Sequence, residues 1–404
     1  MGILNVAIIG AGPAGLTLAK LLQNKSINCT VFEKDSDQYA KNRGGSLDLH
    51  PDSGQSALKE AGLLNEFQKL ARPEGETLRI FSPDGTVLMD ESRGEPGRPG
   101  EFANRPEIDR RQLRDLLLES LTPGTVHWGS KLLKINTQEN SKLTLLFMGG
   151  TEEHDFDLIV GADGAWSKVR PSISEIQPFY AGVSGLDCRI PDVDAKHAEL
   201  AAHVGGGMCL NLGSNKGLMC QRNGDGSIQV YAFARLPSDW YSACGIDFTH
   251  PDARKQVVDA LFPEYNSLQK SLVLDSHPDT VGRQLYMLPV GFQWPHNPRI
   301  TLIGDAAHLM TPFAGVGVNL AMKDALELAH AIIGSANFHE DLSSWSGHLH
   351  KFEVDMWERA EQNAKATIMY QDLFFHERGG IAMVEHFAKR RMEDEQKSQS
   401  GDQE

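Results

Sequence analysis

Residues 6–33 read VAIIGAGPAGLTLAKLLQNKSINCTVFE, and this stretch decides the fold. It begins with Val6–Ile9, a short continuous apolar run of the kind found in strands that are buried on both faces. The motif Gly10-x-Gly12-x-x-Gly15 follows, and the leucines after it recur with helical spacing. A second apolar run, Cys29–Phe32, ends on Glu33. The stretch therefore predicts one complete strand–helix–strand unit.

The glycine loop in this unit predicts a dinucleotide site. Gly10 permits the tight turn, Gly12 lets the backbone approach a pyrophosphate, and Gly15 lets the helix pack closely on the strand. The N-terminus of the helix adds N–H groups and the positive end of its dipole. Glu33 stands where a carboxylate accepts hydrogen bonds from a ribose. A glycine-rich structural turn is the alternative. We expect cofactor contacts from the three glycines and from Ala14, Glu33 and Lys34.

Composition narrows the class of protein. The chain has 404 residues, of which 40% are hydrophobic and 23% charged, enough for a large core and two domains. A formal net charge of −15 disfavours nucleic acid as a partner. The N-terminal sequence has no signal-peptide pattern, and no apolar run is long enough to span a membrane. The five cysteines form no CxxC motif, so we expect reduced thiols in a cytoplasmic protein.

A second motif identifies the dinucleotide. Gly304-Asp305 follows the buried-strand pattern of residues 299–303, and an acid at the tip of such a strand can bind a polyol such as the ribityl chain of FAD. The loop Pro312–Asn319 then leads directly into a helical pattern. The backbone N–H groups of Gly317, Val318 and Asn319 would face the isoalloxazine edge and stabilise negative charge on flavin reduction. For this loop, an ordinary helix-capping turn is the alternative.

Three motifs together resemble the class A flavoprotein monooxygenases, the family of para-hydroxybenzoate hydroxylase. They are the glycine loop, the Asp163-Gly164 turn within Gly161–Arg170, and Gly304–His308 with the loop Pro312–Asn319. The motifs extend from residue 6 to about residue 320. The resemblance implies bound FAD, with NADPH or NADH as a transient reductant and O₂ as a co-substrate. It also places Asp163 among the cofactor-binding residues.

A narrower resemblance is to the TetX-type tetracycline-inactivating monooxygenases. It rests on Gly44–His50 with Ser53–Gln55, on Pro106–Arg110 with Leu113-Arg114, and on His308–Met310 before Pro312–Gly315. The resemblance implies that Glu33 binds the adenosine ribose, and that Asp305 binds the ribityl-pyrophosphate region. It further implies that Asp48, Arg110 and Arg114 belong to the flavin site. Pro312, Phe313 and Gly315 would line the space before the isoalloxazine.

The substrate wall departs from the TetX-type pattern. Ser184 and Met208 stand where that family has a glutamine and an arginine, and Gln229 replaces a histidine. Thr311 and Val316 replace a proline and a glutamine. We expect Ser184, Met208 and Gln229 to contact the substrate together with Pro312, Phe313 and Gly315. The residues expected at the flavin agree with the TetX-type pattern, whereas those expected at the substrate differ from it. Tetracyclines are therefore only one candidate substrate.

The resemblance implies an NAD(P)H-dependent monooxygenase that hydroxylates a polycyclic or phenolic small molecule through a flavin C4a-hydroperoxide. No second glycine fingerprint follows a strand, so the nicotinamide would bind only transiently, and Arg110 is the candidate residue for gating its approach. The alternative for Arg110 is a structural ion pair at a helix N-terminus. Two other functions remain open on this fold: an FAD-dependent dehydrogenase or oxidase, and a flavin-binding protein without enzymatic activity.

Other polar residues favour structural roles. His308 follows an aspartate, but we expect it to make a structural hydrogen bond rather than to form a catalytic dyad. The histidines, cysteines and carboxylates show no metal-ligand spacing, so no metal is expected. The expected partner is a small-molecule substrate, and we expect a monomer that binds neither nucleic acid nor membrane.

The predicted fold class is α/β. We expect a Rossmann-like FAD-binding domain assembled from residues 1–72, 98–175 and 281–340. A β-rich substrate domain, residues 73–97 and 176–280, is inserted into it, and its short strands are separated by Gly, Asn and Asp turns. A C-terminal helix within residues 341–390 would bridge the two domains. Residues 391–404 are polar and are expected to be a disordered tail.

Overall fold

The computed structural model describes residues 4–39, 44–91, 104–137, 143–248, 250–334 and 342–401. The chain forms two compact units, each made of three separate segments. The first comprises Met1–Ala71, Ile108–Phe179 and Tyr286–Thr367, and the second comprises Arg72–Glu107, Tyr180–Leu285 and Ile368–Glu404. The stretch 94–100, whose Gly and Pro residues are typical of a loop, lies outside the described residues.

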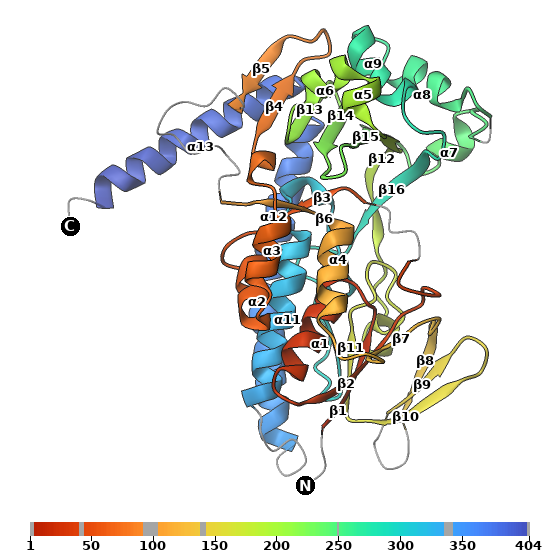
Figure 1. Ribbon diagram of the computed structural model, residues 1–404, viewed down its shortest axis with the longest axis vertical. Coiled ribbons are helices and arrows are strands. Elements are labelled where there is room, and N and C mark those ends of the chain that lie inside the picture. Colours follow the sequence, from red (N-terminus) through yellow and green to blue (C-terminus); the bar gives the residue numbers. More distant parts are fainter. Residues whose placement is uncertain are drawn as a thin grey trace. The chain divides into compact units, whose positions relative to one another are not determined.

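A five-stranded parallel sheet forms the centre of the first unit (Figure 1). Its order is β17 (Ile300–Leu302), β11 (Leu158–Gly161), β1 (Asn5–Ile9), β2 (Asn28–Phe32) and β7 (Val126–His127). All four neighbouring pairs are parallel. Ile8, Val160 and Leu302 have no exposed surface, as expected for apolar strands covered on both faces. The Rossmann-like arrangement predicted from residues 6–33 is confirmed.

Helices of the first unit connect and cover this sheet. They are α1 (Pro13–Gln23), α2 (Gly54–Ala61), α3 (Leu64–Leu70), α4 (Arg110–Glu119), α10 (Asp305–His308), α11 (Gly317–Gly334) and most of α12 (Leu342–Phe374). Helices α1 and α11 pack against each other (Figure 1). A Cβ on Gly304 would lie 3.1 Å from the Cβ of Ala321 and 3.5 Å from that of Ala14. Small residues therefore let the Gly304 loop sit where these two helices meet.

Smaller elements complete the first unit. An antiparallel sheet contains β10 (Glu152–Phe156), β9 (Leu143–Phe147) and β8 (Leu132–Thr137). A two-stranded sheet pairs β3 (Ser46–Asp48) with β6 (Glu107–Asp109), which begins at the unit boundary. The short 3₁₀ turn η3 (Arg170–Ser172) begins at the last residue of the Gly161–Arg170 motif, and η4 (Pro312–Ala314) lies within the loop Pro312–Asn319.

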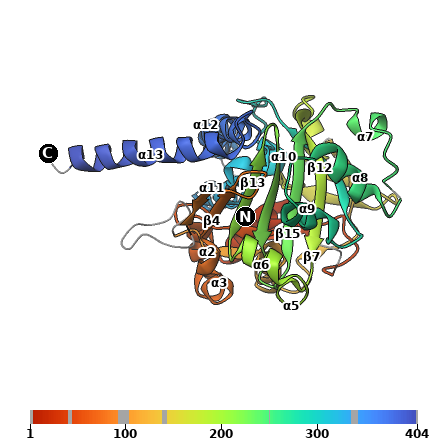
Figure 2. The same cartoon turned by 90° about the horizontal axis from the view of Figure 1, so that it is seen from above.

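The second unit is built on a seven-stranded sheet (Figure 2). Its order is β16 (Val281–Met287), β12 (Phe179–Ile190), β15 (Ile228–Arg235), β14 (Lys216–Arg222), β13 (Met208–Gly213), β4 (Leu78–Phe81) and β5 (Val87–Asp90). Strands β13 and β4 are parallel, whereas the β12–β15, β15–β14, β14–β13 and β4–β5 pairs are antiparallel. The β-rich character expected for this region is therefore present.

Helices that were not expected from the sequence cover one face of this sheet. They are α5 (Val193–Lys196), α6 (Ala198–Val204), α7 (Trp240–Ala243), α8 (Ala253–Leu261) and α9 (Ser267–Leu274), and a 3₁₀ turn, η1, spans Pro73–Gly75. Val257, Val258, Leu272 and Val273 join Cys188 and Val230 of the sheet in one buried cluster. The helices were missed because they are short, and because frequent Gly, Asn and Asp residues dominated the pattern around them.

The C-terminal segment also differs from expectation. Two helices, α12 and α13 (Gly380–Gly401), replace the single predicted helix, and the boundary between the units falls inside α12. The expected disordered tail is wrong up to residue 401, because α13 continues to that point (Figure 2). Residues from Arg391 onward are mostly Glu, Lys, Gln and Ser, and nothing before Gly401 interrupts a helix. Among the described residues, no helix is both long enough and apolar enough to cross a membrane.

Candidate functional site

The glycine loop joins β1 to α1 with glycines that differ in what surrounds them. Gly10 has a φ of +111°, and a Cβ there would lie 2.4 Å from the carbonyl oxygen of Ala162. A Cβ on Gly15 would lie 2.1 Å from the carbonyl oxygen of Gly10. A Cβ on Gly12, in contrast, would meet no atom of the chain within 4 Å. Two glycines are therefore required by the fold itself, while Gly12 leaves space at the helix N-terminus.

Glu33 fastens this loop to the end of β2. The carboxylate is buried, with 8% of the residue exposed, and Oε2 accepts a 2.7 Å hydrogen bond from the N–H of Ala11. Oε1 accepts one of 3.0 Å from the N–H of Asp35. Each carboxylate oxygen can accept a further bond, so ribose hydroxyls could still bind here. Lys34 is exposed next to Glu33, and Ala14 is buried in α1.

The Asp163-Gly164 turn lies directly beside the glycine loop, since Ala162 and Asp163 limit the space at Gly10. The Oδ2 atom of Asp163 accepts a 2.6 Å hydrogen bond from the N–H of Lys168. Its Oδ1 atom is buried without a partner among the described residues. Burial raises the pKa of Asp163, against the lowering effect of these hydrogen bonds. Asp163 thus carries an unsatisfied polar atom next to the predicted pyrophosphate site.

Arg170 connects this turn to the Gly304 loop, and no role was predicted for it from the sequence. Its side chain is almost fully buried and donates to the carbonyl oxygens of Ala306 at 2.9 Å, Ala165 at 2.9 Å and Asp305 at 3.4 Å. Burial lowers the pKa of Arg170, while Asp163 and Asp305 act in the opposite direction. The only signal in the sequence was its place at the end of the Gly161–Arg170 motif.

Asp324 of α11 holds the Gly304 loop in place through hydrogen bonds. Asp324 is fully buried and accepts hydrogen bonds from the N–H of Gly304 at 2.9 Å and from Nε2 of His308 at 2.6 Å. Arg359 of α12 donates to its other oxygen at 3.0 Å. Burial opposes charge on His308, but the carboxylate outweighs it and raises the pKa of the imidazole. Burial likewise opposes charge on Asp324, but His308 and Arg359 lower its pKa overall.

The hydrogen bond predicted for His308 is therefore present, and its partner is structural. Asp305, at the first position of α10, has an exposed side chain. The network of His308, Asp324 and Arg359 fixes the backbone on either side of that carboxylate. Asp305 is thus presented to solvent from a rigid loop, as a ligand-binding acid requires.

The residues predicted to lie at the isoalloxazine connect β3 with the N-terminus of α11. Asn319 is buried, and its side chain accepts a 2.8 Å hydrogen bond from the N–H of His50 and donates one of 2.9 Å to the carbonyl oxygen of Asp48. Nε2 of His50 lies 2.9 Å from Oδ2 of Asp48. A Cβ on Gly315 would lie 3.8 Å from the other oxygen of Asp48. The structure therefore brings Asp48, Gly315 and Asn319 together, as the sequence predicted.

Helix α11 begins with N–H groups that have no partner within the helix. Its first backbone bond runs from the N–H of Leu320 to the carbonyl oxygen of Val316. The N–H groups of Gly317, Val318 and Asn319 precede this bond and form the orphan first turn of the helix. In the adjoining η4 turn, Pro312 and Gly315 are exposed, whereas Phe313 is buried. The arrangement can stabilise a negative charge that lies against this first turn.

Two arginines of α4 behave differently. Arg114 is buried, lies 5.4 Å from the centre of the Trp128 ring, and donates at 3.5 Å to the carbonyl oxygen of Gln38. Arg110 is exposed, and within the described part of the chain its guanidinium has no hydrogen bond or ion pair. Its backbone N–H donates to the carbonyl oxygen of Gly45 at 3.3 Å. The ion-paired alternative for Arg110 is not what the structure shows.

In the second unit, the three predicted substrate residues do not share one face of the sheet. Met208 pairs with Gln221, which pairs with Gln229, so these three residues form one cross-strand row. Ser184 pairs with Ala234, and successive residues of a strand alternate between faces. Positions 229 and 234 of β15 therefore point in opposite directions. Met208 and Gln229 lie on one face, and Ser184 lies on the other.

Ser184 therefore does not share a face with Met208 and Gln229, as one substrate wall would require. It is fully buried on the face covered by the helices, and its hydroxyl lies 2.7 Å from that of Tyr180. On the opposite face, Gln229 hydrogen bonds to Asp187 and, at 2.8 Å, to the carbonyl oxygen of Cys188. Arg283 of β16 pairs with Asp187. An alignment shifted by one residue suffices to place Ser184 on the wrong face, because side chains alternate.

These features of the first unit fit FAD. Gly12 leaves room for a phosphate, and Asp305 is exposed on a fixed loop. Among the described residues, one buried oxygen of Asp163 and the N–H groups in the first turn of α11 have no partner. These donors and acceptors are of the kinds that a pyrophosphate, a polyol and an isoalloxazine edge require. Glycine loop, Asp163 turn and Gly304 loop all lie within one unit.

Comparison with known proteins gives the family. Residues 4–338 match the family model described as FAD binding domain. Monooxygenase asqM of Emericella nidulans is 33% identical over 378 residues, covering 81% of this chain and 83% of that protein. Monooxygenase penA of Penicillium thymicola is 32% identical over 408 residues, covering 90% and 92%.

Solved structures agree on the fold. HpxO of Klebsiella pneumoniae, complexed with FAD and uric acid, has a TM-score of 0.75 at 19% identity and covers 96% of this chain and 92% of its own. Tetracycline destructase Tet(51) has a TM-score of 0.67 at 19% identity, with 93% of each chain covered. At these identities the two structures show the fold alone. The family match and the two curated relatives show more: the chain belongs to the family of FAD-dependent monooxygenases.

Proposed function

We propose that the protein uses NADPH or NADH and O₂ to hydroxylate an electron-rich polycyclic or phenolic small molecule. In the balanced reaction, one oxygen atom of O₂ enters the substrate and the other leaves as water, while NAD(P)H and a proton supply the reducing equivalents. FAD, when bound, accepts the hydride and activates the oxygen. The residues of the chain position the cofactor, exclude water and stabilise charge.

The observation that carries the proposal is the arrangement around β3. On one side, the free N–H groups of the first turn of α11 lie next to Asp48, which Asn319 holds in place. On the other side lies Arg110. Its guanidinium is unpaired among the described residues, and its backbone N–H donates to the carbonyl oxygen of Gly45. A helix N-terminus stabilises the negative charge of a reduced flavin. A free guanidinium can in turn attract the phosphates of an incoming nicotinamide nucleotide.

The substrate class rests on the cross-strand row of the second unit. Met208 offers an adaptable apolar contact on a face where the buried amide groups of Gln221 and Gln229 already donate to the carboxylates of Glu107 and Asp187. Such a wall suits a flat molecule that combines rings with hydroxyl or carbonyl groups. Tetracyclines belong to this class and remain one candidate, although the chain departs from the TetX-type pattern at these positions.

The proposal is tested with the FAD-loaded protein, NADPH and a panel of phenols, polyketides and tetracyclines. We expect at least one compound to accelerate NADPH oxidation and to gain one oxygen atom. A dehydrogenase or oxidase would also consume a reductant or O₂, but would leave no oxygen from O₂ in its product. A flavin-binding protein without enzymatic activity would not reduce its flavin with NADPH or NADH at all.

A further inference from the structure

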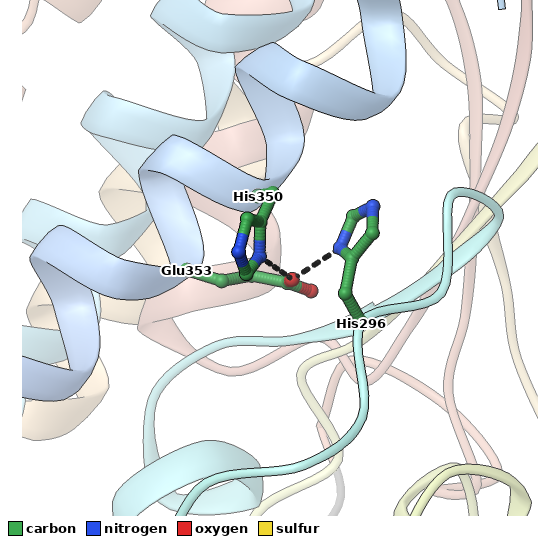
Figure 3. A group of neighbouring side chains, drawn as sticks. All are labelled: His296, His350 and Glu353. Carbon is green, nitrogen blue, oxygen red and sulfur yellow. Dashed lines mark hydrogen bonds and ion pairs between the residues drawn. The ribbon is translucent and has the colours of Figure 1, made fainter. Parts of the chain in front are cut away.

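A second polar cluster of the first unit lies outside the flavin motifs. It comprises His296, in the connection that enters β17, and His350 and Glu353 of α12 (Figure 3). One nitrogen from each imidazole and one carboxylate oxygen lie within 4.8 Å of one another. Nδ1 of His296 lies 2.6 Å from Oε2 of Glu353, and Nδ1 of His350 lies 3.8 Å from the same oxygen.

Glu353 is fixed so that one oxygen faces both histidines. The residue is fully buried, and its Oε1 atom accepts hydrogen bonds from Nε1 of Trp294 at 3.2 Å and from Oγ1 of Thr301 at 2.8 Å. These two donors satisfy Oε1 and leave Oε2 directed at His296 and His350 (Figure 3). A buried carboxylate requires a compensating positive charge, and among the described residues the two imidazoles are the ionisable groups paired with Glu353.

His296 has the supporting contact that metal-binding histidines have. Its Nε2 atom lies 2.8 Å from the hydroxyl of Ser346. A histidine that binds a metal through one nitrogen usually donates the other N–H to an oxygen, which fixes the tautomer and the orientation of the ring. When Nε2–H donates to Ser346, the lone pair of Nδ1 faces Oε2 of Glu353; in the other tautomer Nδ1–H donates to Oε2 and the serine hydroxyl donates to Nε2. In the first tautomer the two acceptors, 2.6 Å apart, need either a proton or a metal cation between them.

We propose that His296, His350 and Glu353 bind a Zn²⁺ ion. Zinc takes imidazole nitrogen and carboxylate oxygen at about 2.0–2.2 Å in tetrahedral geometry, which separates neighbouring ligand atoms by about 3.3 Å. The separations of 2.6 Å and 3.8 Å lie on either side of this value, so small rotations of the two imidazoles form the site. Imidazole ligands disfavour Mg²⁺ and Ca²⁺, which prefer oxygen.

The site is open to solvent on one side. The side chain of His350 is 52% exposed, whereas that of His296 is 20% exposed and that of Glu353 is fully buried. Water can therefore fill the fourth position of the tetrahedron. His296 precedes β17 and Asp305 follows it, so the ion would lie before the strand whose far end leads to the flavin motif. Bound zinc would tie the connection that enters β17 to α12, and it requires no part of the proposed function.

Metal binding to the full-length, FAD-loaded protein tests the proposal. The chain is prepared without a histidine tag, stripped with a chelator, and titrated with ZnCl₂ by calorimetry. We expect one Zn²⁺ per chain, and we expect Co²⁺ in its place to give the visible absorption of a tetrahedral site. His350→Ala removes an exposed ligand and leaves every hydrogen bond to Glu353 in place, so this variant folds. It should weaken Zn²⁺ binding by more than about tenfold, since even the loss of an outer partner costs 10–100-fold at metal sites.

Two further variants make the result decisive. His348→Ala removes an exposed histidine from the same helix, outside the group, and should bind Zn²⁺ like the wild type. Ser346→Ala removes the partner of His296 and should weaken binding by about tenfold. Zn²⁺ should also raise the unfolding temperature of the wild type and of His348→Ala, but not that of His350→Ala. The proposal is overturned if the wild type binds no stoichiometric Zn²⁺, or if His350→Ala and His348→Ala bind it equally well.

Discussion

Asp324 supports the Gly304 loop, and replacing it with asparagine tests how that loop is held. The substitution keeps the shape of the side chain but removes the charge that faces His308 at 2.6 Å and Arg359 at 3.0 Å. It also turns an N–H group toward one of three donors, which are Gly304, His308 and Arg359. Breaking a fully buried charge pair costs about 3–5 kcal/mol. For a domain of about 200 residues, 3 kcal/mol lowers the unfolding temperature by about 6–12 °C.

The effect of Asp324→Asn should depend on pH. In the wild type the pKa of His308 is raised, because the carboxylate of Asp324 outweighs desolvation. Charge on His308 therefore stabilises the fold below its ordinary pKa of about 6.5, and this contribution is lost as the pH rises through the raised value. The pKa of Asp324 is lowered, so its contribution is present above about pH 4 and lost as the pH falls through the lowered value. The stability difference should thus be larger near pH 6 than near pH 9.

The assay is thermal unfolding of Asp324→Asn, Glu327→Gln and wild type, followed by flavin fluorescence at both pH values. Glu327 is a matched control because it pairs with Arg359 at 2.7 Å but is partly exposed, so its loss should cost about 1 kcal/mol or less. Asp324→Asn should also release FAD more readily, since Asp305 stands on the loop that Asp324 fixes. The reasoning is refuted if Asp324→Asn unfolds within the range of the control, or if its deficit is the same at both pH values.

Three further predictions concern the flavin site and the substrate wall. Gly10→Ala should unfold the loop and abolish FAD binding, because its Cβ would lie 2.4 Å from a carbonyl oxygen. Gly12→Ala should keep the unfolding temperature of the apoprotein but weaken FAD binding, which flavin fluorescence measures. Arg110→Ala should change the free energy of unfolding by less than about 0.5 kcal/mol and should slow NADPH-dependent flavin reduction, measured by stopped flow. Arg111→Ala is the control: it loses an exposed ion pair with Asp115 and should leave the rate of flavin reduction unchanged. Met208→Ala should raise the KM for the substrate and Ser184→Ala should not, because the two side chains lie on opposite faces; equal effects in steady-state kinetics would contradict this placement.

The first unit could be predicted from the sequence because its signals are local. Strand Val6–Ile9, the glycines after it and Glu33 depend on neighbouring residues, and each needs a particular residue type for a physical reason. The same holds for Gly304-Asp305 and for the loop that begins α11. Their convergence followed from parallel strands whose carboxyl ends share one edge of the sheet.

What could not be predicted depends on long-range contacts or on the register of strands. Asn319 was expected to use its backbone N–H, but its side chain bonds to Asp48, 271 positions away in sequence. Arg170 and Asp324 act through carbonyl and amide groups of other loops, and no local pattern marks such partners. Ser184 was misplaced because the face of a strand residue depends on exact register. His296 and Glu353 are 57 positions apart, so ligand spacing could not reveal them.

A monooxygenase that acts through FAD transfers one oxygen atom of O₂ to an organic substrate. The most direct test is to supply ¹⁸O₂ to the FAD-loaded protein with NADPH and a compound that accelerates NADPH oxidation, and to analyse the products by mass spectrometry. We expect one ¹⁸O atom in the organic product and the other in water. If NADPH oxidation leaves all of the ¹⁸O in hydrogen peroxide and none in any organic product, the proposed monooxygenation is contradicted.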